Sequence, residues 1–168
     1  MKKENFAIIT NSDEETIQLG RKLGALLAEG DVVALTGELG SGKTWFTKGI
    51  ALGLDVPSET VVVSPSFSLV NVYQGKCSLF HMDVYRLGEL SDFLSAGLEE
   101  YLYEDGVTVM EWADRWPEIL PEWKIAIEIV ILDDCLREFT FSGDHVRAGS
   151  ILEEMGNSGF QFPVDGCQ

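Results

Sequence analysis

The segment from Gly37 to Thr44 has the composition of a phosphate-binding loop. It fits the pattern G-x-x-x-x-G-K-[ST], in which glycines let backbone N–H groups turn toward a β-phosphate. Lys43 is expected to bridge β- and γ-phosphate oxygens, and Thr44 to offer its hydroxyl to Mg²⁺. At average residue frequencies, a chain of this length would show the pattern by chance on the order of once in 100 to 200 cases. We therefore expect a nucleoside triphosphate and magnesium to bind at Gly37, Glu38, Leu39, Gly40, Ser41, Gly42, Lys43 and Thr44.

Two acidic residues come directly after apolar runs that are typical of buried strands. Asp83 follows residues 79–82, and Glu111 follows residues 107–110. Enzymes with this kind of loop need an acidic residue at the end of a neighbouring strand, where it holds the magnesium ion or orients its waters. Either residue could have this role, and a solvated strand end is the competing interpretation for each.

A short segment, Ser64-Pro65-Ser66, lies between the loop and the first of these acidic residues. Nucleotide-hydrolysing proteins often place a mobile segment here, whose hydroxyl senses the γ-phosphate. Serine and proline are also ordinary turn residues, so the residues by themselves leave both interpretations open.

The pattern of apolar residues predicts the elements that hold these side chains. A continuous apolar run at 32–35 predicts a buried strand that enters the loop, and residues 44–54 predict the helix that follows it. Ser12 and Glu15 have the spacing of a capping box, which starts an earlier helix after a short strand at 6–10. Later elements are expected to be two hairpin strands at 67–73 and 78–85, a helical segment at 90–103 that Gly97 could break, strands at 107–112, 125–132 and 138–141, and a helix at 146–155.

Length and element order indicate one α/β domain. The chain has 168 residues, which suits a single core. We predict a single P-loop NTPase-like three-layer domain, with a central mixed, largely parallel sheet and an antiparallel hairpin. The predicted domain covers residues 1–156, and residues 157–168 form a C-terminal tail.

The composition argues against several classes of function. A formal net charge of -16 makes strong direct binding to nucleic acid unfavourable, because such binding depends on Lys and Arg neutralising phosphates. No apolar run reaches the roughly 18 residues that a membrane span needs. The three cysteines, Cys77, Cys135 and Cys167, lack the spacing of a zinc site or a disulfide framework, so we expect reduced thiols and a cytoplasmic protein.

Taken in order, four segments make the chain resemble the TsaE (YjeE) family of small bacterial ATPases. They are the loop Gly37–Thr44, then 64–73 with the sequence SPSFSLVNVY, then 81–87 with HMDVYRL, and Glu111-Trp112. The match covers most of the chain. The family takes part in the threonylcarbamoyl modification of tRNA adenosine next to the anticodon.

The resemblance implies a role for each matching residue. Lys43 and Thr44 would bind phosphate and Mg²⁺, Glu111 would complete the metal site, and Asp83 would orient or activate the attacking water. Ser66 would be a switch residue. Two further residues would lie close to the nucleotide: Trp112 and Arg137.

The chain also departs from the family pattern. Ser66 stands where the family usually has Thr, which keeps the hydroxyl and loses the methyl group. Trp45 replaces a small hydroxyl residue, and Ala113-Asp114 stands where a Pro-Glu or similar pair often follows the Trp. These changes affect local packing more than the chemistry.

The resemblance further implies that ATP and Mg²⁺ act within a complex with the TsaD and TsaB proteins, where a weak ATPase would be stimulated. Two other functions stay open: a small-molecule P-loop kinase, and a nucleotide-sensing scaffold that does not hydrolyse ATP. A kinase would be expected to bring several arginines over the phosphates. The guanine-specific N-K-x-D sequence is absent, which favours ATP over GTP.

Overall fold

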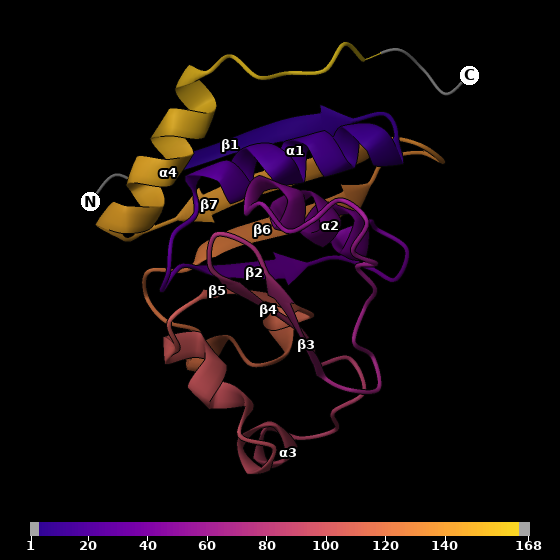
Figure 1. Ribbon diagram of the computed structural model, residues 1–168. Helices are drawn as coiled ribbons and strands as arrows, with labels where there is room; N and C mark the ends of the chain where they lie inside the picture. The colour runs from indigo at the N-terminus through magenta and orange to yellow at the C-terminus, as the bar shows by residue number, and fades with distance from the viewer. Residues whose placement is uncertain (1–3, 165–168) are drawn as a thin grey trace.

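The strands of the protein form one sheet. The computed structural model describes residues 4–164, with seven strands in the order β1-β7-β6-β2-β5-β4-β3 (Figure 1). Their bounds are β1 (Glu4–Thr10), β2 (Val32–Thr36), β3 (Val70–Gln74), β4 (Ser78–Asp83), β5 (Val107–Glu111), β6 (Ile125–Ile131) and β7 (Arg137–Gly143).

The sheet is mixed, as the sequence predicted. The four central strands β6, β2, β5 and β4 pair in parallel. The outer pairs β1–β7, β7–β6 and β3–β4 are antiparallel, and the last of these is the predicted hairpin. Parallel pairing is therefore confined to the centre, where β2 runs into the glycine-rich loop.

Helices cover both faces of the sheet, which confirms the three-layer fold. Their bounds are α1 (Asp13–Leu26), α2 (Lys43–Gly53), α3 (Leu90–Ser95) and α4 (Val146–Asn157). Strand β2 is buried on both faces: Val33 and Leu35 pack in the cluster with α1, α2 and α4. Val32 and Ala34 pack in a second cluster, with α3 and the 3-10 segments Leu98–Tyr103 and Ala113–Arg115.

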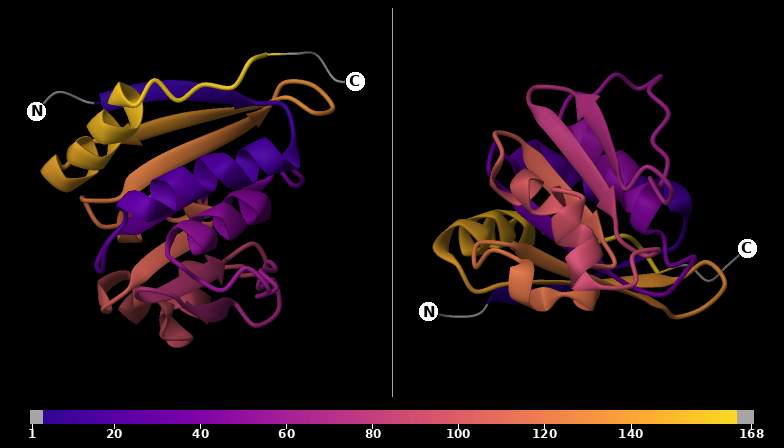
Figure 2. Two further views of the ribbon diagram at one scale, coloured as in Figure 1. Left: turned by 45° about the horizontal axis from the view of Figure 1, so that its top comes forward. Right: turned by 90° about the horizontal axis from the view of Figure 1, so that it is seen from below.

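Helices α1 and α2 lie side by side on one face, with their backbones in close approach (Figure 2). A Cβ atom on Gly20 would lie only 2.2 Å from the carbonyl oxygen of Phe46, so α1 needs glycine at that position. The start of α1 is fixed by Ser12, whose hydroxyl accepts a hydrogen bond from the N–H of Glu15 at 3.1 Å. This packing holds the beginnings of the two helices next to each other.

One segment confirms a detail of the sequence prediction, and another corrects it. The helical segment expected at 90–103 is α3 followed by a 3-10 helix, and they are separated by Gly97 with φ 72°. The strand expected from residue 67 begins only at Val70, because Leu69 has φ 69° and its N–H bonds the carbonyl oxygen of Pro65. This turn holds residues 64–67 out of the sheet.

The chain after α4 runs back along the body of the protein (Figure 1). Phe160 and Phe162 pack against the larger core cluster. Residues 165–168, the last part of the predicted tail, lie outside the described residues. Between residues 4 and 164, the structure has no helix long and apolar enough to cross a membrane.

Candidate functional site

A large open cavity lies at the carboxyl ends of the parallel strands, where ligands bind in open α/β sheets. Its volume is about 940 Å³, within the usual range for small-molecule sites. The loop, the segment at 64–66 and the ends of β4 and β5 all contribute to it. Residues predicted from the sequence that line the cavity are Leu39, Gly40, Ser41, Gly42, Lys43, Thr44, Ser66, Asp83, Glu111, Trp112 and Arg137.

The loop has the backbone conformation that its glycines permit. Gly37 has φ 152°, and a Cβ atom there would lie 2.6 Å from Ser41 Oγ and 2.7 Å from the carbonyl oxygen of Ile129. Gly42 directly precedes α2 and provides no side chain to cap it. The first N–H groups of α2 are therefore available to an anion in the cavity.

The Lys43 ammonium is held at the base of the loop. Its Nζ atom donates hydrogen bonds to the carbonyl oxygens of Gly37 at 2.7 Å and Glu38 at 2.9 Å. Gly37 and Glu38 do not line the cavity, and their observed role is to position this lysine. Burial lowers the pKa of Lys43, and the nearby carboxylates of Glu111 and Asp83 oppose that shift. These carboxylates favour the charged form that an anionic ligand requires.

Trp112 contacts the same lysine. The Lys43 Nζ atom lies 4.0 Å from the centre of the indole ring, a cation–π contact. Trp112 has φ 63°, a left-handed conformation that bulky residues rarely adopt, and it turns the chain out of β5. The indole also contacts Tyr85, with ring centres 4.7 Å apart.

Thr44, Asp83 and Glu111 meet beside the loop. Asp83 and Glu111 are paired residues of the parallel strands β4 and β5. The Thr44 hydroxyl donates a hydrogen bond to Glu111 Oε1 at 3.1 Å. Asp83 Oδ1 accepts the N–H of Tyr85 at 2.9 Å, and Asp83 Oδ2 accepts the hydroxyl of Ser64. Both carboxylates are buried, so their orientations are fixed by the protein.

These oxygen atoms suit a magnesium ion bound together with phosphates. Mg²⁺ prefers oxygen ligands and is usually held by one or two carboxylates with substrate phosphates. Thr44 and Glu111 provide a hydroxyl and a carboxylate in contact at the base of the cavity. Within residues 4–164 there is no cluster of three or more His, Cys, Asp or Glu that would hold a metal ion without a nucleotide.

The remaining predicted residues lie at the rim. Ser66 lines the cavity in the turn between α2 and β3. Arg137 lines it at the start of β7, and its Nη1 atom donates to the backbone carbonyl oxygens of Asp133 at 2.8 Å and Leu136 at 3.0 Å. The guanidinium therefore also closes the turn between β6 and β7.

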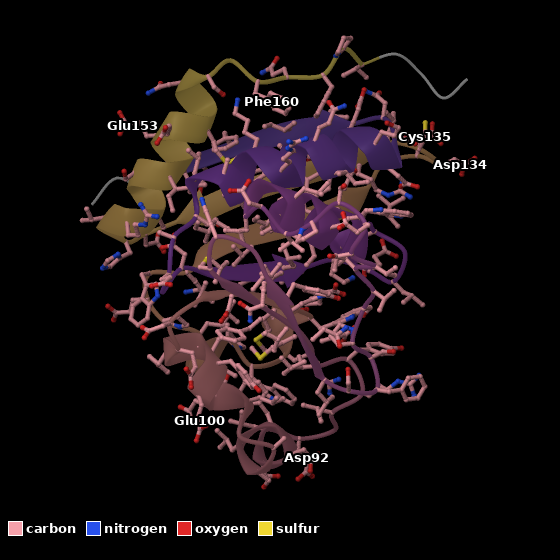
Figure 3. The ribbon with its side chains drawn as sticks, in the orientation of Figure 1. Asp92, Glu100, Asp134, Cys135, Glu153 and Phe160 are labelled. Carbon is pink, nitrogen blue, oxygen red and sulfur yellow. The ribbon has the colours of Figure 1, made fainter. Side chains whose placement is uncertain are left out.

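That turn contains Cys135, which Figure 3 labels beside Asp134. Cys135 is disulfide-bonded, so the prediction of a reduced thiol is wrong for this residue. Cys77 is a free thiol, as predicted. Cys167 lies outside the described residues.

Three contributions to the site were not identified from the sequence. Ser64 bonds Asp83, and His81 bonds Glu111. The cavity lining also includes residues 11–14 and Thr16, at the start of α1. His81 had a detectable signal, because residues two apart on a strand face the same side and Asp83 was already a candidate. No signal in the sequence predicted that the start of α1 approaches the loop, because this approach depends on how α1 and α2 pack.

Comparison with known proteins identifies the family that this chain resembles. A family model described as "Threonylcarbamoyl adenosine biosynthesis protein TsaE" matches residues 10–138. The "tRNA threonylcarbamoyladenosine biosynthesis protein TsaE" of Treponema pallidum (strain Nichols) is 46% identical over 132 residues, which cover 79% of this chain and 96% of that protein. The protein of the same name from Bacillus subtilis (strain 168) is 40% identical over 147 residues, covering 87% of this chain and 90% of that protein.

A solved structure has the same fold. The crystal structure of YdiB from Bacillus subtilis superimposes with a TM-score of 0.80 and 34% sequence identity. The superposition covers 95% of this chain and 99% of YdiB. The matched region of the family model contains the loop, both strand-end carboxylates and Trp112.

Proposed function

Because the chain belongs to the TsaE family of threonylcarbamoyladenosine biosynthesis, we propose that it is the ATP-binding and ATP-hydrolysing subunit for this tRNA modification. The modified base would be the adenosine next to the anticodon. One observation carries the proposal: the Thr44 hydroxyl and the carboxylates of Asp83 and Glu111 meet beside the glycine-rich loop. These are the groups that magnesium-dependent phosphoryl transfer requires.

The loop would bind the phosphates of ATP. Backbone N–H groups from Gly40 to Thr44 would hold the β-phosphate, and the N-terminus of α2 would add its partial positive charge. Lys43 would leave the carbonyl oxygens of Gly37 and Glu38 and pair with β- and γ-phosphate oxygens. Trp112, next to this ammonium, would sense the change.

Thr44 and Glu111 would hold the magnesium ion of the bound nucleotide. When bound, Mg²⁺ neutralises charge on the β- and γ-phosphates. Asp83 would orient the attacking water, since its carboxylate is fixed by Ser64 and by the N–H of Tyr85. Ser66, which lines the cavity, would contact the γ-phosphate and report its presence.

The transfer chemistry itself would belong to TsaD, in a cytoplasmic complex with TsaB that stimulates a weak ATPase. This division suits the strong acidity of the chain, with its formal net charge of -16. Acidic residues project from separate parts of the molecule, as Asp92, Glu100 and Glu153 do in Figure 3. We propose that acidic residues of this chain contact a basic surface of the partners. Binding to TsaD–TsaB should weaken as salt concentration rises, and salt-independent binding would contradict this docking mode.

The rival functions differ in what they do with ATP. A kinase would phosphorylate an added metabolite in stoichiometric amount, and a sensing scaffold would release no phosphate. Arg86 and Arg137 are the arginines that line the cavity within residues 4–164, and Arg137 bonds backbone carbonyl oxygens of its own turn. The paired arginines of a kinase lid are therefore not formed in the described part of the chain.

The test is reconstituted modification of tRNA with purified TsaD, TsaB and the other substrates of the reaction. Adding this chain with ATP and Mg²⁺ should sustain repeated cycles of modification and increase phosphate release. The variant Asp83→Asn should bind ATP and fail to sustain modification. Modification that continues unchanged without the chain, or with a variant that cannot bind ATP, would contradict the proposal.

A further inference from the structure

His81 is a buried polar side chain that the proposed chemistry does not use. It lies on β4, two residues before Asp83, and its side chain is 0% exposed. Its Nε2 atom lies 2.7 Å from Oε1 of Glu111, whose side chain is 3% exposed. The ring therefore contacts the carboxylate that would hold magnesium, deep below the cavity surface.

The partner fixes the direction of this hydrogen bond. An ionised carboxylate oxygen only accepts hydrogen bonds, so the ring proton must be on Nε2. The other ring nitrogen, Nδ1, is buried and has no hydrogen-bond partner among residues 4–164. Leaving a buried polar atom unpaired costs free energy, and an apolar ring of similar size would avoid that cost. A histidine at this position can donate a hydrogen bond to Glu111, and an apolar residue cannot.

The bond also determines which oxygen of Glu111 is left for a ligand. Oε1 accepts from His81 and from the Thr44 hydroxyl, and these are the hydrogen bonds that described residues donate to this carboxylate. With Oε1 held on two sides, the carboxylate cannot rotate without breaking a buried hydrogen bond. Oε2 is then available to a magnesium ion or to one of its waters.

We propose that His81 is a positioning residue for magnesium, which acts by holding Glu111 in the orientation that the metal site needs. The inference rests on the proposed function, since it takes Glu111 as part of the magnesium site of the bound nucleotide. Partners of this kind, which hold a metal-binding side chain without touching the metal, affect metal affinity by about 10- to 100-fold.

Two variants separate positioning from packing. His81→Phe keeps a ring of similar volume and removes the donor. His81→Gln keeps an amide N–H close to the position of Nε2. The control is Thr108→Val on β5, which removes a partly buried hydrogen bond to the carbonyl oxygen of Tyr101 at 2.7 Å and does not touch Glu111.

The measurement is the affinity for a non-hydrolysable ATP analogue, with MgCl₂ and with EDTA, by calorimetry. The ratio of the two affinities isolates the contribution of magnesium. We expect H81F to lower this ratio by about 10-fold or more, with little change in EDTA. H81Q should recover most of the ratio, and T108V should keep the wild-type value.

Two results would overturn the proposal: a wild-type ratio in H81F, or an equal loss of affinity with and without magnesium. If H81F does not fold, as judged by thermal melting, His81→Asn takes its place, because its shorter amide does not reach Glu111. If the wild-type protein binds the analogue equally well with and without magnesium, the proposed function itself is contradicted. A large wild-type ratio that H81F leaves unchanged would overturn only the role of His81.

Discussion

Asp83 and Glu111 are direct partners in the parallel register of β4 and β5. Paired residues of neighbouring strands project to the same face of the sheet, here the face that carries α2. The two carboxylates therefore reach the base of the same cavity although they are far apart in sequence. Thr44 bonds Glu111, and Ser64 bonds Asp83, so each carboxylate has its own partner and its own expected role.

Glu111→Ala should weaken nucleotide binding mainly when magnesium is present. The change removes a carboxylate that is expected to hold the ion, and it leaves the phosphate-binding loop in place. We expect affinity for ADP in MgCl₂ to fall by at least about 10-fold, with a much smaller loss in EDTA. Glu128→Ala, on the exposed side of β6, removes the same charge and should change neither value. Equal losses in both conditions would mean that Glu111 has a structural role.

Asp83→Asn should separate binding from hydrolysis. The amide keeps the size of the side chain and loses the negative charge that is proposed to orient the water. We expect ATP affinity to stay near that of the wild type, and phosphate release with TsaD–TsaB to fall by about 10²- to 10⁴-fold. The matched control is Asp55→Asn at an exposed position with φ 62°, which Asn tolerates. Unimpaired hydrolysis in D83N would remove Asp83 from the mechanism.

Ser66→Ala should reduce the preference for ATP over ADP. If the hydroxyl contacts the γ-phosphate, its loss removes a hydrogen bond that only the triphosphate can make. Such a bond to a charged group contributes about 1.5–3 kcal/mol, so the ratio of affinities should fall by roughly 10-fold or more. Ser66→Thr should keep the ratio, and so should Ser68→Ala, which alters an exposed serine of the same turn. An unchanged ratio in S66A would assign the serine to the turn alone.

Trp112→Phe should abolish most of the fluorescence change that accompanies nucleotide binding. The indole lies 4.0 Å from Lys43 Nζ, and its surroundings change when that ammonium moves to a phosphate. Trp123→Phe is the control, because this indole bonds the carbonyl oxygen of Gly30 and does not line the cavity. A full signal in W112F would place the reporting tryptophan elsewhere.

The parts of the site that could be predicted from sequence are those set by local patterns. The loop is recognisable because residue type decides its backbone conformation, as at Gly37. Asp83 and Glu111 were predicted at strand ends because an apolar run directly precedes each of them. The mixed sheet, the hairpin and the break at Gly97 follow from the same kind of pattern.

The parts that could not be predicted depend on contacts between distant segments. The register that pairs Asp83 with Glu111 is set by the whole sheet. The hydrogen bonds of Ser64 and His81 exist only once β4, β5 and the preceding turn have packed. The start of β3 was predicted three residues too early, because a turn closed by Leu69 and Pro65 replaces regular pairing there.

Phosphate release by the Lys43→Ala variant shows whether the loop binds ATP for hydrolysis. The assay contains ATP, Mg²⁺ and TsaD–TsaB, with no phosphoryl acceptor. Lys48→Ala is the control, since it removes the same charge from the same helix and lies outside the cavity. We expect the wild type and K48A to release phosphate, and K43A to bind ATP poorly and release phosphate at the background rate. Wild-type ATP affinity and phosphate release in K43A would rule out ATP hydrolysis at this loop.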